Sequence, residues 1–211
     1  MVDNKDIIVN KFNEDSVVEF RQKVLERSML DPNIPIVVYI DSYGGYVDSC
    51  NAMIETLRQV PNPIVTVCLG KAMSCGAVLL AAGDHRFCGK NSRVMIHQTT
   101  SGDYGPTEEL RNSTKEAERL NDMFMQILAE RCNKSLNELK ELIKKNEARD
   151  LYLDAKACLE FGIVDQIGMP IIKPIVLYNV EPAPEKKFTT EPVEIKNTKK
   201  ANKKSKSKVK K

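Results

Sequence analysis

The chain has 211 residues, 42% of them hydrophobic, which is enough for one domain of ordinary size or two small ones. A disulfide-stapled miniprotein is therefore excluded. The longest apolar runs, at residues 36–40 and 77–82, fall well short of the roughly 20 residues that a membrane-spanning helix needs. The charged opening, residues 1–6, leads into a strand-like run and not into the apolar segment of a secretory signal, so the expected compartment is the cytoplasm.

The formal net charge of +3 combines two unlike parts. Residues 196–211 hold nine Lys and no acidic residue, whereas residues 1–195 carry 23 basic and 29 acidic side chains. A run of Lys, Ser and Asn buries too little apolar surface to offset its ordering entropy. We therefore expect a domain at 1–180 and a disordered Lys-rich C-terminal tail at 181–211. The tail either only keeps the chain in solution or loosely attracts polyanions; its lysines lack the interleaved aromatic residues of a nucleic-acid reader.

The six cysteines form no C-x-x-C pair, and most lie inside apolar runs. They are Cys50, Cys68, Cys75, Cys88, Cys132 and Cys158. This usage is typical of reduced, buried thiols in a cytosolic protein. Zinc needs clustered His and Cys ligands, and the chain has only His85 and His97, so no metal site is expected. Gly44 and Gly45 lack the G-x-G-x-x-G spacing of a dinucleotide loop, so no nucleotide cofactor is expected either.

Strand and helix patterns alternate along the first hundred residues. Short apolar runs predict strands at 7–9, 36–40, 64–69 and 93–96, and helical spacing predicts helices from about 17 to 25, 47 to 59 and 74 to 82. The uninterrupted run 36–40 is typical of a strand buried on both faces of a parallel sheet. Repeated β-α units predict the α/β class with a parallel sheet.

A long helix is predicted from Pro106 to about residue 133. Its first half is nearly all polar, whereas its second half carries an apolar stripe that ends with Phe124, Ile127 and Leu128. A helix that is polar along half its length projects from the body or meets a partner chain. A capping box at 135–138 predicts a short helix to about 145, the segment 149–153 and a helix at 154–161 complete the domain, and residues 171–180 form a candidate last strand.

Ser74 follows a predicted strand and a turn that contains Gly70. A serine at a helix start is usually an N-cap, and the G-x-S-x-G elbow is absent because Ala72 stands two positions before it. Yet the helix behind Ser74 is apolar and therefore buried. Cys75 adds a backbone N–H at the positive end of that helix, where an oxyanion would be stabilised. Ser74 is thus a candidate nucleophile with half an oxyanion hole beside it.

His97 ends a strand that we expect to lie beside the strand before Ser74, which makes it a candidate base; the ordinary alternative is a strand-end histidine in a polar loop. His85 lies in an expected exposed turn at 83–86 and is interpreted as structural. Among 29 acidic residues, Asp150 is one of several that could orient an imidazole. Gly44 and Gly45, directly after a predicted strand, either let the backbone approach a ligand closely or form a plain turn.

Several segments together resemble one known family in order and spacing. They are YIDSYGG at 39–45, GKAMSCGAVLLAAG at 70–83, NSRVMIHQ at 91–98, Arg149-Asp150 and EFGIVD at 160–165. From about residue 7 to 168 the chain is similar to the proteolytic subunits of the Clp protease family, the ClpP-like serine peptidases. The resemblance implies a crotonase-like (ClpP-type) β-α spiral with a projecting handle helix. It also implies a homo-oligomer of two stacked, heptameric rings around a chamber in which protein or peptide substrates are cleaved.

Carried over residue by residue, the resemblance implies that Ser74 is the nucleophile of a serine endopeptidase and His97 its general base and then acid. Asp150 would fix the imidazole tautomer, and the backbone N–H groups of Gly45 and Cys75 would form the oxyanion hole. One departure is Tyr43, where the family usually has Pro, so a residue of fixed φ is lost beside an oxyanion donor.

A second departure is that the match begins almost at the start of the chain. No counterpart is expected for the axial segment with which the family engages a Clp-type ATPase unfoldase, so that partnership stays open.

Other functions remain to be weighed against this one. They are an ATPase-independent phage capsid-maturation protease of the same fold, a non-catalytic ring subunit, a CoA-dependent crotonase relative and a Ser/Lys signal-peptide peptidase. A non-catalytic subunit should have lost a catalytic residue, whereas Ser74, His97 and Asp150 are all present. The same three residues argue against the crotonase relative, and His97 together with the lack of a membrane anchor argues against the Ser/Lys peptidase.

Overall fold

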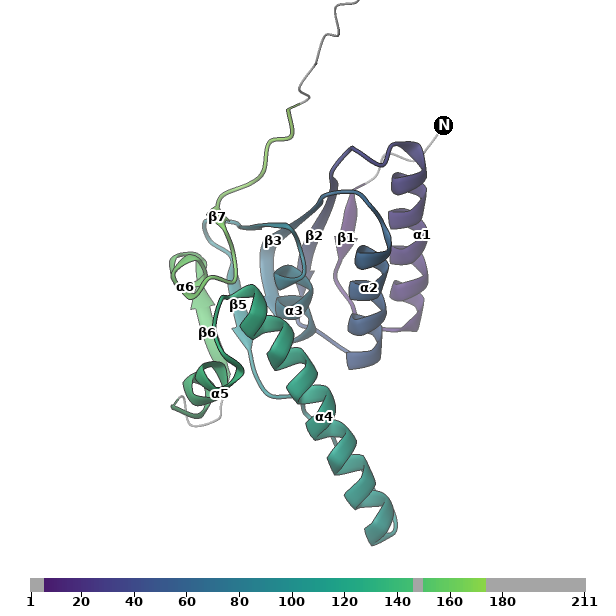
Figure 1. The fold of residues 1–211 in the computed structure, drawn as a ribbon, viewed down its shortest axis with the longest axis vertical. Coiled ribbons are helices and arrows are strands. Elements are labelled where there is room, and N and C mark those ends of the chain that lie inside the picture. Colours follow the sequence, from purple (N-terminus) through teal and green to yellow (C-terminus); the bar gives the residue numbers. More distant parts are fainter. Residues whose placement is uncertain (1–5, 146–149, 174–211) are drawn as a thin grey trace, which may run out of the picture. The chain divides into compact units, whose positions relative to one another are not determined.

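The structure is a computed structural model that describes residues 6–145 and 150–173. Within these ranges one sheet holds seven strands (Figure 1). The strands are β1 (Ile7–Val9), β2 (Ile36–Ser42), β3 (Ile64–Met73), β4 (His85–Cys88), β5 (Arg93–Ile96), β6 (Leu151–Asp154) and β7 (Gln166–Ile167). No helix in the described ranges is long and apolar enough to cross a membrane.

Six helices connect and cover these strands in the described part of the chain. They are α1 (Glu14–Leu30), α2 (Val47–Gln59), α3 (Cys75–Ala81), α4 (Thr107–Arg131), α5 (Leu136–Lys145) and α6 (Ala155–Phe161). Local sequence explains their ends. Asn13 caps α1 because its side chain accepts a hydrogen bond from the Ser16 backbone N–H at 2.9 Å, and Gly162 ends α6 in a left-handed conformation.

The sheet is predominantly parallel, which confirms the predicted α/β class. Its main order is β1-β2-β3-β4-β7, and β5 pairs with both β3 and β6. The strands of the first hundred residues pair in parallel, as predicted, and among the described strands β6 is the exception because it runs antiparallel to β5. This strand follows the long α4–α5 excursion and not a direct β-α crossover, so the chain returns to the sheet from the opposite direction.

Strand β3 is longer than predicted and pairs with two strands in succession. The turn expected at Gly70 is absent, and β3 continues to Met73. Its first half pairs with β4, where Val65 lies opposite His85, and its last residues pair with β5, where Met73 lies opposite Met95. His85 therefore begins a strand and not a turn, although it is exposed as expected. The fork in β3 brings the ends of β3 and β5 together at one edge of the sheet.

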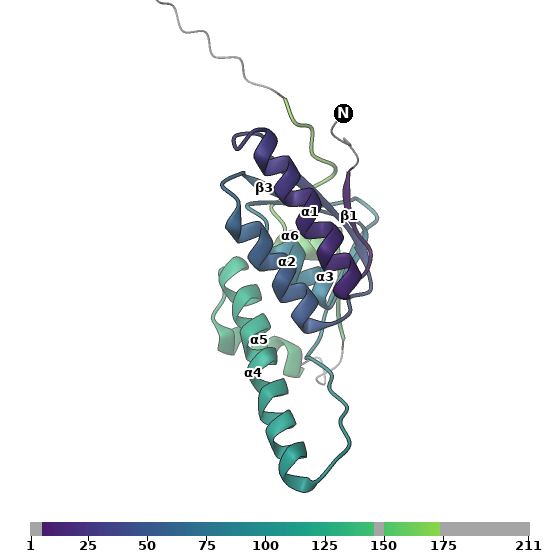
Figure 2. The ribbon, with the colours of Figure 1, turned by 90° about the vertical axis from the view of Figure 1, so that its right-hand side faces the viewer.

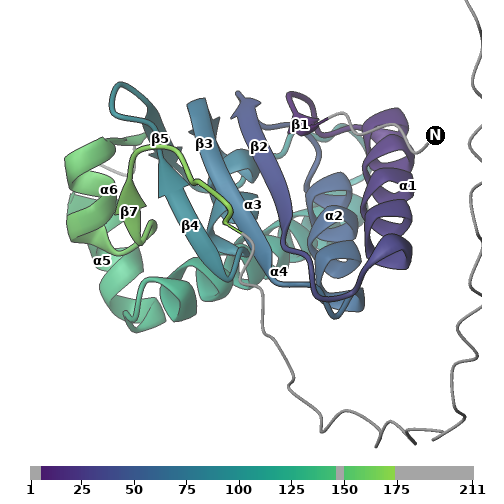
Figure 3. The ribbon, with the colours of Figure 1, turned by 90° about the horizontal axis from the view of Figure 1, so that it is seen from above.

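Helices α1, α2 and α3 lie on one face of the sheet (Figure 3). Strand β2 accordingly alternates between buried and half-buried residues, so Val38 and Ile40 are fully buried whereas Val37 and Tyr39 are not. The prediction that this strand is buried on both faces is therefore wrong. The opposite face of β2 is covered only in part by the described residues.

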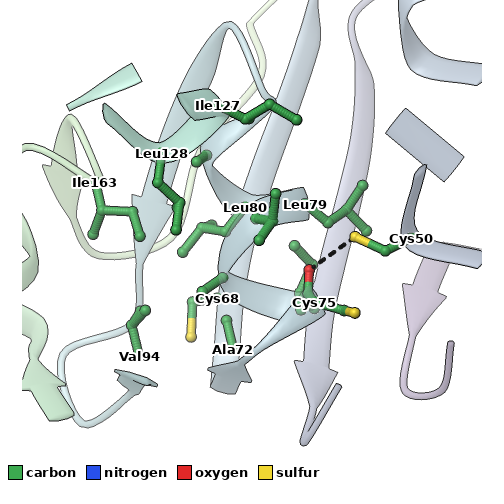
Figure 4. Close-up of a cluster of buried hydrophobic side chains, with 14 of the residues drawn as sticks. Cys50, Cys68, Ala72, Cys75, Leu79, Leu80, Val94, Ile127, Leu128 and Ile163 are labelled. Carbon is green, nitrogen blue, oxygen red and sulfur yellow. Dashed lines mark hydrogen bonds between the residues drawn. The ribbon is translucent and has the colours of Figure 1, made fainter. Parts of the chain in front are cut away.

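Helix α3 is the centre of the hydrophobic core. All seven of its residues are buried, and Leu79 and Leu80 pack between sheet residues such as Cys68 and helix α4, which contributes Ile127 and Leu128 (Figure 4). Because the residue before α3 is Ser74, this close packing fixes the position of that serine at the edge of the core.

Helix α4 has two halves of different character, as the sequence predicted. The second half contributes Phe124, Met125, Ile127, Leu128 and Ala129 to the core, whereas most of the first half is exposed and extends away from the sheet (Figure 2). The candidate strand at 171–180 has no regular structure at 171–173, and its remainder lies outside the described residues. The expected domain boundary after residue 180 and the Lys-rich tail lie outside them as well.

Candidate active site

Ser74 lies between the end of β3 and the start of α3 in an unusual backbone conformation. Its φ is 52° and its ψ is −119°, a sparsely populated region for a residue with a side chain. Its backbone N–H donates a hydrogen bond to the Met95 carbonyl at 2.9 Å, which ties the turn to β5. The side chain makes no capping hydrogen bond to α3, so the ordinary N-cap interpretation of Ser74 is wrong. Strain of this kind concentrates at functional positions.

His97 follows β5 directly and reaches Ser74. The parallel pairing of Met73 with Met95 places the two strand ends side by side, as the sequence predicted. The Nε2 atom of His97 lies 2.8 Å from the Ser74 Oγ, which is hydrogen-bond distance. The imidazole can therefore accept the proton of the serine hydroxyl in this geometry.

Asp150 precedes β6, whose antiparallel pairing with β5 sets Leu151 opposite Ile96. One carboxylate oxygen, Oδ1, lies 3.8 Å from the Nδ1 atom of His97. The other oxygen, Oδ2, accepts a hydrogen bond from the Tyr152 hydroxyl at 3.4 Å. The carboxylate faces the imidazole at a distance longer than a direct hydrogen bond, as is common in enzymes without bound substrate.

The backbone of residues 42–45, which we call the oxyanion loop after the role expected for the Gly45 N–H, passes directly against Ser74. Gly44 and Gly45 both have positive φ, 104° and 156°. A Cβ atom on Gly44 would lie 2.8 Å from the Ser74 Cβ and 3.0 Å from the Met73 carbonyl oxygen. A Cβ on Gly45 would lie 2.4 Å from the Phe12 carbonyl oxygen. Only glycine permits both the conformation and this close approach.

Two side chains that the sequence did not mark hold this loop. The hydroxyl of the fully buried Ser42 donates to the Asn10 carbonyl at 3.0 Å and accepts from the Gly44 N–H at 3.1 Å. The Cys75 thiol donates to the Gly45 carbonyl at 3.3 Å. The only signal for Ser42 in the sequence was its place after an apolar run. For Cys75 the sequence indicated the backbone N–H and not the thiol.

Cys75 is itself tied to helix α2. The Cys50 thiol donates to the Cys75 carbonyl at 3.4 Å (Figure 4). A hydrogen bond with the Cys50 thiol lowers the pKa of Cys75, against the opposing effect of burial. All six cysteines are free and buried, as predicted.

A cleft of about 290 Å³ opens beside Ser74 and His97. Its wall includes Tyr43 and Gly45 from the oxyanion loop, and part of its lining is apolar, with Val78 from α3 and Phe124 and Leu128 from α4. A volume of this size suits a small ligand or one peptide side chain. Among the described residues, the lining contains no carboxylate and no Lys or Arg, and Thr99 and Thr100 add hydroxyl groups to it.

The remaining candidate residues lie elsewhere. His85 pairs with Val65 near the start of β3, nine residues before Ser74, and therefore at the opposite end of that strand. Among the residues that the structure describes, no group of three or more His, Cys, Asp or Glu side chains is arranged to hold a metal ion.

The sequence is similar to those of known proteins. The sequence profile described as Clp protease matches residues 1–170. The chain belongs to the Clp protease family. It is 39% identical over 158 residues to ATP-dependent Clp protease proteolytic subunit 1 of Corynebacterium diphtheriae, an alignment that covers 74% of each chain. The predicted family and α/β fold are thereby confirmed, and the chain is a serine-type peptidase of the Clp type.

Proposed function

We propose that this Clp-family chain is an endopeptidase that cleaves peptide bonds through an acyl-enzyme on Ser74. The observation that carries the proposal is the 2.8 Å contact between the Ser74 Oγ and the His97 Nε2, made by a serine of positive φ that lies against a two-glycine loop. A structural N-cap serine would instead bond to its own helix.

In the first half of the reaction the Ser74 Oγ attacks the substrate carbonyl while His97 accepts the hydroxyl proton. The tetrahedral intermediate carries a negative oxygen, which the backbone N–H groups of Gly45 and Cys75 stabilise. His97 then donates its proton to the leaving amine, and the C–N bond breaks. Asp150 holds the Nδ1–H tautomer of the imidazole throughout, once the 3.8 Å separation has shortened in the substrate complex.

The second half of the reaction releases the acyl group. His97 takes a proton from water, and the hydroxide attacks the ester carbonyl of the acyl-enzyme. The same two backbone N–H groups stabilise the second tetrahedral intermediate. Ser74 leaves with the proton from His97, which restores the free enzyme.

The substrates we infer are peptides and unfolded proteins that place an apolar side chain in the cleft. The lining by Val78, Phe124 and Leu128 supports this inference. The exposed half of α4 is the surface through which two rings of subunits would interlock into a chamber, with seven subunits per ring as the resemblance implies. The free, buried cysteines fit a reducing compartment, and we place the activity in the cytoplasm.

The name of the relative describes an ATP-dependent protease. A Clp-type ATPase is accordingly the partner to add when unfolded protein alone is a poor substrate.

The proposal is tested with a fluorophosphonate, which forms a covalent bond to an activated serine and releases fluoride. Intact mass and peptide mapping should show one adduct on Ser74 in the wild type and none in Ser74→Ala or His97→Ala. Both variants should also lose cleavage of a fluorogenic peptide with an apolar residue before the scissile bond, while native mass shows unchanged assembly. An assembled wild type that gives no adduct would instead support the non-catalytic ring subunit.

A further inference from the structure

Tyr43 lies in the oxyanion loop, whose backbone conformation has to be restricted by contacts with neighbouring residues. It stands between the buried Ser42 and the two glycines of positive φ, which are the most conformationally free residues of the site. Tyr43 is 71% exposed, and yet its side chain forms part of the cleft wall. An exposed tyrosine in front of two glycines does not by itself restrict the loop.

The neighbouring strand supplies that restriction through Lys71. The ammonium Nζ of Lys71 lies 4.5 Å from the centroid of the Tyr43 ring. It also lies 2.8 Å from the Asp41 Oδ1, with which it forms an ion pair. One ammonium therefore contacts the ring of the loop residue and a carboxylate of β2 at once. Both distances are within the range of favourable cation–π and ion-pair interactions.

A register shift between β2 and β3 places Lys71 near Asp41 and Tyr43. Ile40 pairs with Cys68 and Ser42 pairs with Ala72, so β3 carries two more residues than β2 over this interval. The extra length is a bulge of the kind that redirects a side chain. Within it, a Cβ on Gly70 would lie 3.0 Å from the Asp41 Oδ1, so glycine leaves room for the carboxylate.

The position of Lys71 separates it from an ordinary surface ion pair. Its side chain is 21% exposed, compared with 42% for Asp41, and it stands three residues before Ser74. Exposed ion pairs such as Lys23–Glu19 on α1 contribute little. Lys71 contacts the loop whose Gly45 N–H must point at the developing oxyanion, so a small displacement there changes the rate.

We propose that Lys71 is a positioning residue of the oxyanion loop: it holds the Tyr43 ring between the cleft and β3 and so keeps the Gly45 N–H in its catalytic direction. The proposal rests on the function proposed for Ser74 and assigns Lys71, Tyr43 and Asp41 a role in the same site. Its effect belongs to the transition state, because a loose loop weakens oxyanion binding more than substrate binding.

The test compares Lys71→Met with Lys71→Arg, and Tyr43→Leu with Tyr43→Phe. Lys71→Met keeps the apolar stem and removes the charge, whereas Lys71→Arg and Tyr43→Phe keep a cation and a ring. The two disruptive variants should lower kcat about two- to fivefold and raise the Ki of a peptide boronate by a similar factor, with KM nearly unchanged. Each conservative variant should have a higher kcat and a lower Ki than the disruptive variant at the same position.

The double variant Lys71→Met with Tyr43→Leu should be no slower than the slower single variant, because both substitutions remove the same contact between the Lys71 ammonium and the Tyr43 ring. The matched control is Lys23→Met, which removes the Lys23–Glu19 ion pair on α1. This variant should leave kcat and Ki unchanged. Unchanged kcat and Ki in both disruptive variants, or losses that add in the double variant, would overturn the proposal.

Two further outcomes are distinguishable. If Lys71→Met unfolds, the comparison of Tyr43→Leu with Tyr43→Phe tests the proposal instead. The Tyr43 side chain is exposed, so these two variants should still fold. A wild type without a fluorophosphonate adduct on Ser74 would refute the proposed function itself and not only the role of Lys71.

Discussion

The sharpest prediction concerns the substitution Gly44→Ala. The φ of Gly44 is +104°, and an added Cβ would lie 2.8 Å from the Ser74 Cβ and 3.0 Å from the Met73 carbonyl oxygen. Neither atom is the end of a flexible side chain, so the loop has to move. The unfavourable φ alone costs on the order of 1–3 kcal/mol. That cost corresponds to a fall in Tm of roughly 2–12 °C for a domain of this size.

The effect on catalysis should be much larger than the effect on stability. Displacement of the loop removes the Gly45 N–H from the oxyanion, and loss of one such donor costs about 10²- to 10³-fold in kcat. The assay is cleavage of a fluorogenic peptide with an apolar residue before the scissile bond, with thermal unfolding and native mass measured on the same samples.

A matched control separates the effect of the unfavourable φ from the effect of the steric overlap with Ser74 and Met73. Gly168 has a φ of +122°, and nothing lies within 4 Å of its added Cβ. Gly168→Ala should therefore show a comparable fall in Tm with a kcat close to that of the wild type. The reasoning is refuted if Gly44→Ala keeps a kcat within about tenfold of Gly168→Ala, because the oxyanion donor would then not depend on this close approach.

Three further predictions concern the site and the ion pair between Arg86 of β4 and Asp165, which directly precedes β7. In steady-state kinetics, Asp150→Asn should lower kcat about 10²- to 10⁴-fold, because the amide no longer favours the productive imidazole tautomer. Thermal unfolding should show a nearly unchanged Tm. Cys75→Ala should lower kcat about two- to fivefold and Cys75→Ser should restore it, because a weak hydrogen bond to the Gly45 carbonyl is lost and then replaced; equal rates in the two variants would contradict this. Burial raises the pKa of Asp165, but hydrogen bonds from Arg86 outweigh burial and the net pKa is lowered. The stability that this carboxylate contributes is therefore present above its unfolded-state pKa of about 4 and is lost as the pH falls through the lower folded-state value, so Asp165→Asn should flatten the acid side of a Tm-against-pH profile.

Much of the fold could be predicted from local sequence. Apolar runs and helical spacing predicted β1, β5 and α2 closely, because those elements bury a continuous face whose period is visible in the chain. The length of β3 could not be predicted in this way. Gly70 resembles a turn residue locally, but the paired strands β2 and β5 keep the backbone extended through Met73.

The candidate site, too, could be predicted only in part from the sequence. Residue types and their places in the predicted elements pointed to Ser74, His97 and the Cys75 N–H, whereas Asp150 and the Gly45 N–H were implied only by the family resemblance. The sequence also indicated that the strands before Ser74 and His97 are neighbours. What it did not contain was the positive φ of Ser74, which arises where β3 meets the buried start of α3. Backbone strain of this kind is imposed by packing on both sides and has no local sequence pattern.

By itself, the sequence determined the α/β class, the helix that is polar along its first half and the identity of the residues that could do chemistry, because periodicity and residue type are local properties. Only the tertiary structure decided which groups support them. Ser42 meets Asn10 and Gly44, and Lys71 meets Tyr43 and Asp41, through the register of neighbouring strands. Register depends on how whole strands pair, and a shift by one residue would turn each of these side chains to the other face of the sheet.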